Sequence, residues 1–268
     1  MSESKDPHVV RSRVWREEAE PDNPFAARAA YCRGYDVYGD MLGRARWVEM
    51  LWLLFQDEPP ASAQADLLEA LALALANPGP RDASVHAAMC AGVCGSPAAS
   101  ALMAALAVGA GGLSGGREIL LAMQGWEACG TDLAAWQRWL PQPPSLAGSV
   151  WPEAGHAPGF DPHGVSTPRP VMQTLECLVG YHSGGALNWL QANLLALEAA
   201  AGCPLALSGV AAAAFTDLGF APEQGEFLHL LLRLPGAAAH ALEQGPLGYK
   251  KFPFGTVELQ TTVGKEPA

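Results

Sequence analysis

The sequence predicts an all-α protein, and three observations support that prediction. Apolar residues recur at helical spacing through most of the chain, whereas a strand-like pattern is nearly confined to 256–259. Hydrophobic residues make up 50% of the 268 residues and charged residues only 16%, against about 25% in an ordinary domain. Segments rich in proline and glycine separate the helical patterns. We therefore expect a large helical core with little sheet.

The elements follow from these patterns in chain order. Residues 1–30 are charged and contain several prolines, so they are interpreted as an extended arm. Residues 141–170 form a Pro/Gly-rich loop, and loops of that length are usually functional or disordered. Ser62 has the residue type of a helix N-cap. The predicted helices cover 41–55, 63–76, 84–94, 97–109, a segment from 116, 132–140, 171–181, 186–201, 205–218, 223–234 and 235–243.

The charge of the chain limits its partners. The net charge is −11, so neither nucleic acid nor an anionic membrane is an expected partner, since both attract basic surfaces. Between residues 118 and 249 the basic residues are only Arg138, Arg169 and Arg233. An anion site in this stretch therefore depends on those side chains, on backbone N–H groups or on helix N-termini.

The uncharged stretch 87–116 is long enough to be considered as a membrane span. Its Ala, Gly and Ser content, Pro97 and the lack of basic flanks instead predict a buried helical hairpin, part of which would suit a dimer interface. The N-terminus lacks the apolar region of a signal peptide. Six scattered cysteines in a chain of this size predict reduced thiols, and we expect a cytoplasmic protein.

Three residues have metal-ligand chemistry. His86, Cys90 and Cys94 share one face of a predicted helix. Successive turns lie about 5.4 Å apart, so a straight helix hardly directs all three to one ion. Packing is the favoured interpretation, and no metal site is predicted.

Other side chains suggest acid–base chemistry. The loop 141–170 contains His156, Asp161, His163 and Arg169, which could act on a carboxylate substrate or could be solvated loop residues. Ser114 lies in a Gly-rich turn that lacks both the nucleophile elbow and the lysine of a phosphate loop.

Several motifs resemble the citrate synthase superfamily, and its shorter citryl-CoA lyase-like branch is the closer match. Arg33–Gly34–Tyr35–Asp36 and the following 43–59 resemble an RGYD turn and the helix after it. The segment 77–84 resembles D-H-G-P…S, and 111–118 resembles G-x-x-H-G-G-A-x-E. Ser208–Gly209, then Arg233 and 239–244, resemble the closing S-G…A-R…A-H-x-x-E-Q segment. The resemblance runs from about residue 31 to 258 and implies a citrate synthase-like helical fold.

The same resemblance implies that three functional residues of the family are replaced in this sequence. The family's substrate-binding His falls on Pro78, its enolising His on Ser114, and its catalytic Asp on Leu205. A leucine cannot accept the α-proton of an acyl-CoA thioester. Each missing group is expected to cost about 10²–10⁴ in rate.

The resemblance also implies roles for residues that are present. Gly159–Phe160–Asp161–Pro162–His163, ending at Arg169, resembles the family's G-F-G-H…D-P-R loop. His163 would act as acid or base, Ser114 as an oxyanion donor and Asp161 as the replacement carboxylate. Arg169 and Arg233 would hold substrate carboxylates, and Lys250 and Lys251 would contact coenzyme A or a partner subunit.

Two functions follow as alternatives. The first is an enzyme that makes or breaks a C–C bond between an acyl-CoA and a 2-oxo acid, or acts on a citryl-CoA-like thioester. The second is a catalytically silent relative that binds coenzyme A or a carboxylate and pairs with a partner. In both, the expected ligands are an acyl-CoA and a small di- or tricarboxylate, and no permanently bound cofactor is expected.

The resemblance further implies a domain division and an oligomer. We expect a large helical domain from 31–116 and 205–268, with a smaller domain at 117–204. A homodimer, or a heterodimer with a homologous subunit, is expected, with the site in a cleft between the domains.

Overall fold

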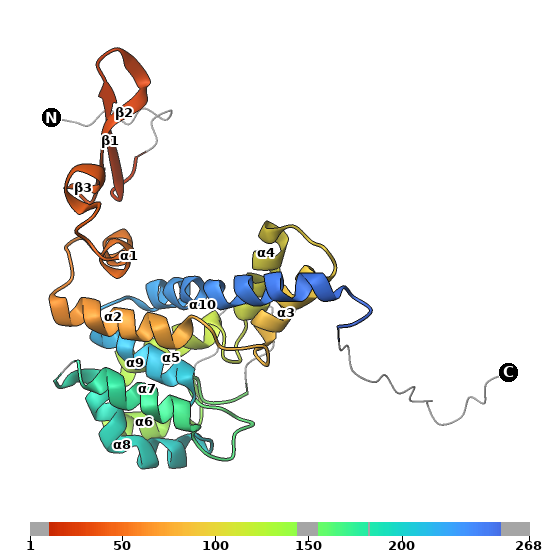
Figure 1. Ribbon diagram of the computed structural model, residues 1–268. Helices are drawn as coiled ribbons and strands as arrows, with labels where there is room; N and C mark the ends of the chain where they lie inside the picture. Colours follow the sequence, from red (N-terminus) through yellow and green to blue (C-terminus); the bar gives the residue numbers. More distant parts are fainter. Residues whose placement is uncertain (1–10, 144–154, 182, 253–268) are drawn as a thin grey trace. The chain divides into compact units, whose positions relative to one another are not determined.

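The computed structural model describes residues 11–143, 155–181 and 183–252 (Figure 1). The predicted all-α architecture is confirmed, because helices dominate these residues. The predicted extended piece at 256–259 lies outside the described residues. The helices are α1 Trp47–Phe55, α2 Ser62–Leu75, α3 Ala83–Val93, α4 Ala98–Gly109, α5 Gly116–Cys129, α6 Leu133–Trp139, α7 Arg169–Val179, α8 Gly185–Ala201, α9 Leu207–Asp217 and α10 Pro222–Gln244, with short π and 3₁₀ turns at Val37–Met41 and Gly245–Leu247.

Several helix boundaries differ from the predicted ones. The N-cap of α2 is Ala61 and not the predicted Ser62, and Leu205 lies before α9 and not at its start. The helix expected from residue 41 begins at Trp47, because 37–41 form the π turn. The two helices expected at 223–234 and 235–243 are one continuous helix, α10, with Pro235 inside it. Proline removes one helical hydrogen bond and so predicts a break; apolar packing on both sides of Pro235 favours continuation, since Leu232 and Ala237 are both buried.

The arm expected at residues 1–30 contains a β-hairpin. Strands β1 (Trp15–Glu20) and β2 (Asn23–Cys32) pair antiparallel, and β2 also pairs with β3 (Tyr35–Asp36). Across the hairpin, the Arg16 guanidinium lies 4.1 Å from the centre of the Tyr31 ring. The sequence hides this sheet because β2 is rich in alanine and has no β-branched residue, so its strand propensity is low.

The chain divides into two compact units, Met1–Asn77 with Gly109–Arg233 and Pro78–Val108 with Leu234–Ala268. In this division the segment 117–204 groups with the residues before 78, unlike the expected large and small domains. The expected division remains a prediction about the protein's domains.

The first unit is built around α9. Residues 210–215 of this helix are completely buried, and four of them are alanines that allow the neighbouring helices to approach closely. Helices α5, α8, α7 and α2 pack against it. Phe215 is among the largest fully buried side chains, so α9 is the central element of this core.

The second unit contains α3, α4 and α10 from Leu234 onward. Its core combines buried small residues of these helices, including Ala88, Ala105 and Ala241. A Cβ atom on Gly92 would lie only 2.2 Å from the Ala241 carbonyl oxygen, so glycine is required there for close helix contact.

No helix in the described part of the chain combines the length and apolarity needed to cross a membrane. None of the six cysteines is in a disulfide.

Candidate functional site

The Gly-rich turn before α5 holds Ser114 in an unusual conformation. Its φ angle is +53°, in the left-handed region that non-glycine residues rarely adopt. Its backbone N–H donates to the Glu118 carboxylate. Its carbonyl oxygen accepts from Arg233 Nη1 at 2.5 Å and lies 3.4 Å from His229 Nε2. Glu118 of α5 therefore binds the N–H of Ser114, and Arg233 of α10 binds its carbonyl oxygen. The Ser114 side chain is exposed.

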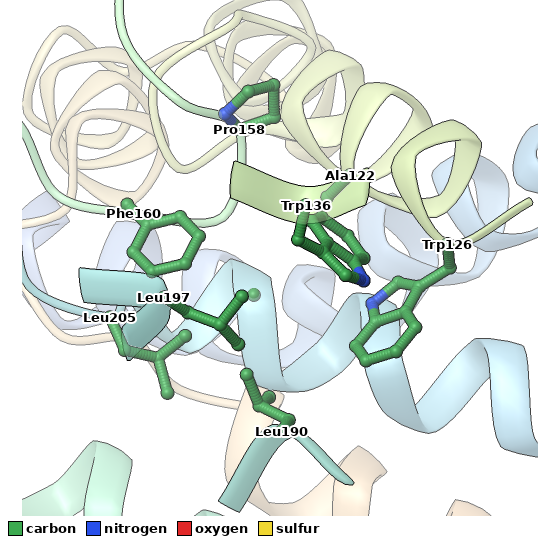
Figure 2. A pocket seen from close by; sticks show the side chains of 9 residues that line it. Ala122, Trp126, Trp136, Pro158, Phe160, Leu190, Leu197 and Leu205 are labelled. Carbon is green, nitrogen blue, oxygen red and sulfur yellow. The ribbon is translucent and has the colours of Figure 1, made fainter. Parts of the chain in front are cut away.

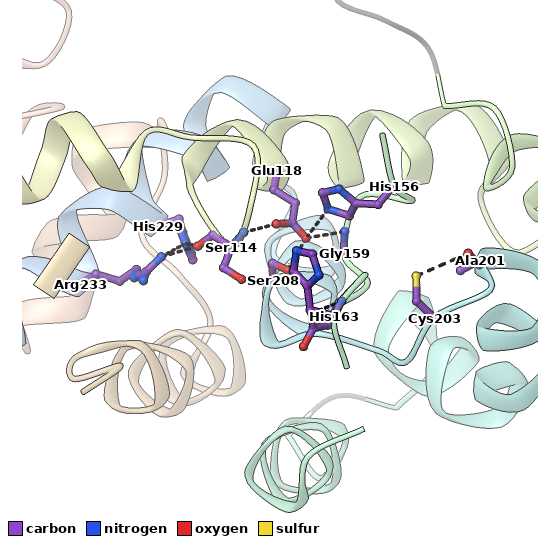
Figure 3. A network of polar contacts seen from close by, with 11 residues as sticks. Ser114, Glu118, His156, Gly159, His163, Ala201, Cys203, Ser208, His229 and Arg233 are labelled. Atoms are coloured by element: carbon purple, nitrogen blue, oxygen red, sulfur yellow. Dashed lines mark hydrogen bonds and ion pairs between the residues drawn. The ribbon is translucent and has the colours of Figure 1, made fainter. Parts of the chain in front are cut away.

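The Glu118 carboxylate is the centre of this polar network (Figure 3). It is only 2% exposed, in the first turn of α5. Its Oε1 accepts from the Ser208 hydroxyl at 2.8 Å and from the Gly159 N–H at 2.9 Å, and His156 Nε2 lies 3.9 Å away. Together with Ser114, three donors therefore compensate for the burial of this carboxylate.

Arg233 and His229 lie one turn apart on α10 and are both buried. Their Nη1 and Nε2 atoms are 2.9 Å apart. Because a guanidinium only donates, His229 Nε2 is the acceptor, which assigns the ring proton to Nδ1. The Arg233 side chain, expected to hold a substrate carboxylate, directs Nη1 at the Ser114 carbonyl instead.

The loop that contains Asp161 and His163 is tied to the segment before α9. The Asp161 carboxylate accepts from the His163 N–H at 2.9 Å, and the Asp161 N–H donates to the Pro204 carbonyl at 2.8 Å. Glu198 of α8 accepts from the Thr167 hydroxyl and the Leu205 N–H. Asp161 therefore caps its own turn, and the loop has a fixed position against α8 and α9.

The structure does not unite the predicted catalytic residues. Within the described residues, no hydrogen bond joins Asp161 or His163 to Ser114. His163 is exposed, and so is Arg169, the first residue of α7. Lys250 and Lys251 are exposed in the second unit, where Lys250 Nζ lies 5.9 Å from the centre of the Tyr249 ring. The roles assigned to these residues remain predictions.

Sequence reasoning missed both Glu118 and His229 as site residues. With Ser114 aligned to the histidine of the motif that 111–118 resembles, the motif's glutamate falls on Ile119, one residue after Glu118, so the pattern did not single out Glu118 itself. Its partner Ser208 is 90 residues away, and only the packing of α5 on α9 brings the two together.

Leu205, at the position that resembles the family's catalytic Asp, is completely buried in the apolar core. It borders a cavity in the first unit, with Ala122 and Trp126 of α5 and Leu197 of α8 (Figure 2). Trp136, Phe160 and Leu190 also border this cavity, and none of the nine residues that line it is titratable. The position at which the resemblance predicts a general base is thus part of an apolar surface.

In the described residues, no group of three or more His, Cys, Asp and Glu side chains is arranged to hold an ion. His86 packs its ring 5.5 Å from that of Phe252. The pKa of the Cys203 thiol is raised, first by burial and then by the nearby carboxylates of Asp161, Glu118 and Glu198.

Comparison with solved structures shows the fold. Citryl-CoA lyase from Hydrogenobacter thermophilus matches with a TM-score of 0.73 at 16% identity, over 97% of this chain and 98% of that one. ATP citrate lyase from Methanothrix soehngenii, in complex with citrate and coenzyme A, matches with a TM-score of 0.72 at 17% identity over 97% of this chain, but only 43% of that chain is covered.

Citrate synthase from Thermotoga maritima matches with a TM-score of 0.59 at 18% identity, over 82% of this chain and 59% of that one. No protein-family model matches the sequence, and no curated protein matches it at a significant level. The structural likeness shows a citrate synthase-like helical fold.

Proposed function

We propose, from this citrate synthase-like fold and the chemistry of its site, that the chain binds a coenzyme A thioester and a small carboxylate without an ordinary catalytic base. The observation that carries the proposal is Leu205. It is 0% exposed and surrounded by apolar side chains. A general base must accept a proton at the reacting atom, and neither this side chain nor its apolar neighbours can do so.

Neither of the two carboxylates near this position replaces that base in this arrangement. Glu198 accepts from the Leu205 N–H and from the Thr167 hydroxyl. Glu118 already accepts from Ser208, Gly159 and Ser114. These bonds stabilise the charged carboxylate and fix the turn before α5. These hydrogen bonds therefore favour a structural role for Glu118. In this role its carboxylate positions the loop and the Gly-rich turn around a ligand.

In this proposal the chain still binds ligands of the kind that its structural relatives bind, but it no longer catalyses their reaction. Citrate and coenzyme A are the ligands named for the Methanothrix soehngenii enzyme. Arg169 is the exposed basic residue of the first unit expected to reach a carboxylate, and Lys250 or Lys251 would contact the thioester or a partner subunit. The protein would act as a homodimer, or as the silent subunit of a heterodimer with an active homologue.

The deciding experiment combines binding and turnover. Isothermal titration calorimetry with coenzyme A, acetyl-CoA and citrate should give measurable binding. Assays with citryl-CoA, and with acetyl-CoA plus oxaloacetate, should give no protein-dependent rate. Turnover that is lost in Arg169→Ala but kept in an Arg138→Ala control would refute the proposal that the protein is catalytically silent.

A second candidate, an enzyme that cleaves or forms the citryl-CoA-type C–C bond, is favoured by one observation. Glu118, His156 and Ser208 place a carboxylate, an imidazole and a hydroxyl together in a buried position beside Ser114. In this candidate Glu118 takes the role of the base once a ligand displaces one of its donors. Turnover abolished in Glu118→Gln, with unchanged coenzyme A affinity, would support it.

A further inference from the structure

His229 and Arg233 of α10 form a buried pair that holds the Gly-rich turn before α5 (Figure 3). The exposed fraction is 2% for His229 and 8% for Arg233. Arg233 Nη1 carries two N–H groups. One donates to the Ser114 carbonyl oxygen at 2.5 Å and the other to His229 Nε2 at 2.9 Å. The guanidinium is therefore fixed between a backbone acceptor and an imidazole acceptor.

This arrangement requires a neutral imidazole. A guanidinium has no acceptor, so His229 Nε2 accepts with a lone pair that a protonated ring does not have. Protonation would also place a second buried cation beside the guanidinium, with 2.9 Å between the two nitrogen atoms. The hydrogen bond between Arg233 and His229 is therefore lost when the ring takes up a proton.

A protonated ring has another acceptor within reach. His229 Nε2 lies 3.4 Å from the Ser114 carbonyl oxygen, which accepts from Arg233 in the present arrangement. An Nε2–H group can donate to that oxygen and displace the guanidinium from it. Two donors therefore compete for one carbonyl, and the proton on His229 decides between them.

The other charged groups at the turn are engaged elsewhere. Glu118 of α5 lies on the N–H side of Ser114, where its carboxylate accepts from three donors. Arg117 of α5 pairs with Glu226 of α10 at 3.7 Å. The guanidinium, a like charge for a protonated His229, is thus in direct contact with the ring, whereas both carboxylates are bonded to other groups.

We propose that His229 is a positioning residue whose protonation state sets the conformation of the Gly-rich turn. The neutral ring keeps Arg233 on the Ser114 carbonyl, and the protonated ring takes that carbonyl and releases the guanidinium. The turn responds because Ser114 has a φ of +53°, a conformation that persists only where surrounding contacts hold it. The proposal concerns the protein without ligand, so it goes beyond the proposed function and does not depend on it.

Hydrogen exchange followed by mass spectrometry tests the proposal on the full-length protein. The readout is the protection of peptides that contain the Ser114 N–H, corrected for the intrinsic effect of pH on exchange. Histidine changes its charge between about pH 5 and pH 8, so protection is compared at these two values. The wild-type protein should lose about tenfold in protection at the lower pH. Equal protection at both values would overturn the proposal.

Two variants separate positioning from packing. His229→Gln keeps an acceptor, the amide oxygen, that does not titrate, so its protection should stay high at both pH values. His229→Leu has no acceptor, so its protection should be low at both. His240→Gln is the matched control, since His240 lies on the same helix with its ring 3.3 Å from the Glu243 carboxylate, and it should follow the wild type.

A His229→Gln variant that loses protection at the lower pH as the wild type does would overturn the proposal. If His229→Leu does not fold, the wild type, the glutamine variant and the control still decide. Failure of coenzyme A or citrate to bind would contradict the proposed function and leave this inference standing, so the two failures are distinguishable.

The tautomer of His229 gives a second test that does not involve exchange at the turn. Nitrogen NMR of protein labelled at its histidines should show the His229 proton on Nδ1 at about pH 8. Arg233→Leu removes the donor to Nε2, so the proton should move to Nε2 and donate to the Ser114 carbonyl. A proton on Nε2 in the wild-type protein would overturn the proposal.

Discussion

The Ser208 hydroxyl donates to Oε1 of the buried Glu118 carboxylate at 2.8 Å, and this bond joins α9 to α5. The same oxygen accepts from the Gly159 N–H at 2.9 Å, and the other oxygen accepts from Ser114. One side chain thus connects the Gly-rich turn, the loop after residue 155 and the central helix of the first unit.

Glu118→Gln should destabilise the protein by about 1–3 kcal/mol, because the new amide N–H₂ group faces a donor that needs an acceptor. Urea unfolding followed by circular dichroism measures the change. Glu127→Gln is the control, since Glu127 is an exposed residue of the same helix, and it should change stability by less than about 0.5 kcal/mol. Equal stability of both variants would contradict the role of Glu118.

Ser208→Ala should cost about 1 kcal/mol, because it removes one donor to the buried carboxylate. Its effect should not add to that of Glu118→Gln, since the two residues share a bond. A double-mutant cycle in urea measures this coupling. Strict additivity would show that the Ser208–Glu118 bond contributes nothing to stability.

Ser114→Gly should leave stability unchanged or raise it by up to about 1 kcal/mol, because glycine adopts a φ of +53° without strain. Ser114→Val should lower stability by more than about 1 kcal/mol, because a β-branched side chain is strongly disfavoured there. Both effects are measured by thermal unfolding. Equal melting temperatures for the glycine and valine variants would argue against the left-handed conformation.

Leu205→Asp should not restore a catalytic site in the present apolar surroundings. It should lower stability by about 3–5 kcal/mol, as expected for an uncompensated buried charge. Leu205→Met, which conserves volume, should cost less than about 1.5 kcal/mol. Chemical denaturation of the two variants provides the comparison, and a stable Asp variant that turns over citryl-CoA would refute the prediction.

The cysteines give a pH-dependent prediction. Burial is the main cause that raises the pKa of the Cys32, Cys129 and Cys203 thiols. A group with a raised folded-state pKa contributes stability that is complete below its unfolded pKa, about 8.5 for a thiol, and is lost as pH rises through the folded value.

Stability should therefore fall above about pH 8.5, and this loss should be smaller in Cys203→Ala. Iodoacetamide at pH 8 should label the exposed Cys94 and Cys177 before Cys203. Mass spectrometry of the labelled peptides measures the order. Labelling of Cys203 at the rate of Cys94 would contradict the raised pKa.

The sequence alone determined the helical architecture, because the spacing of apolar residues is a local property that survives without tertiary information. It also identified Leu205, Ser114 and Arg233 as the positions to examine. It missed the hairpin at 15–32, because its alanine-rich strand has low intrinsic propensity, whereas the antiparallel pairing and the Arg16–Tyr31 and Arg28–Glu18 contacts join residues far apart in the sequence.

Only the tertiary structure decided what these positions do. The packing of α5 on α9 placed Glu118 beside Ser208 and gave the carboxylate its donors, and no pattern in either helix encodes that pairing. The bridge between the loop at Phe160 and the segment before α9 placed Leu205 against Phe160, and an apolar cavity lies beside it. Residue type sets the chemistry that a position can perform, whereas long-range packing sets the partners and the dielectric in which that chemistry occurs.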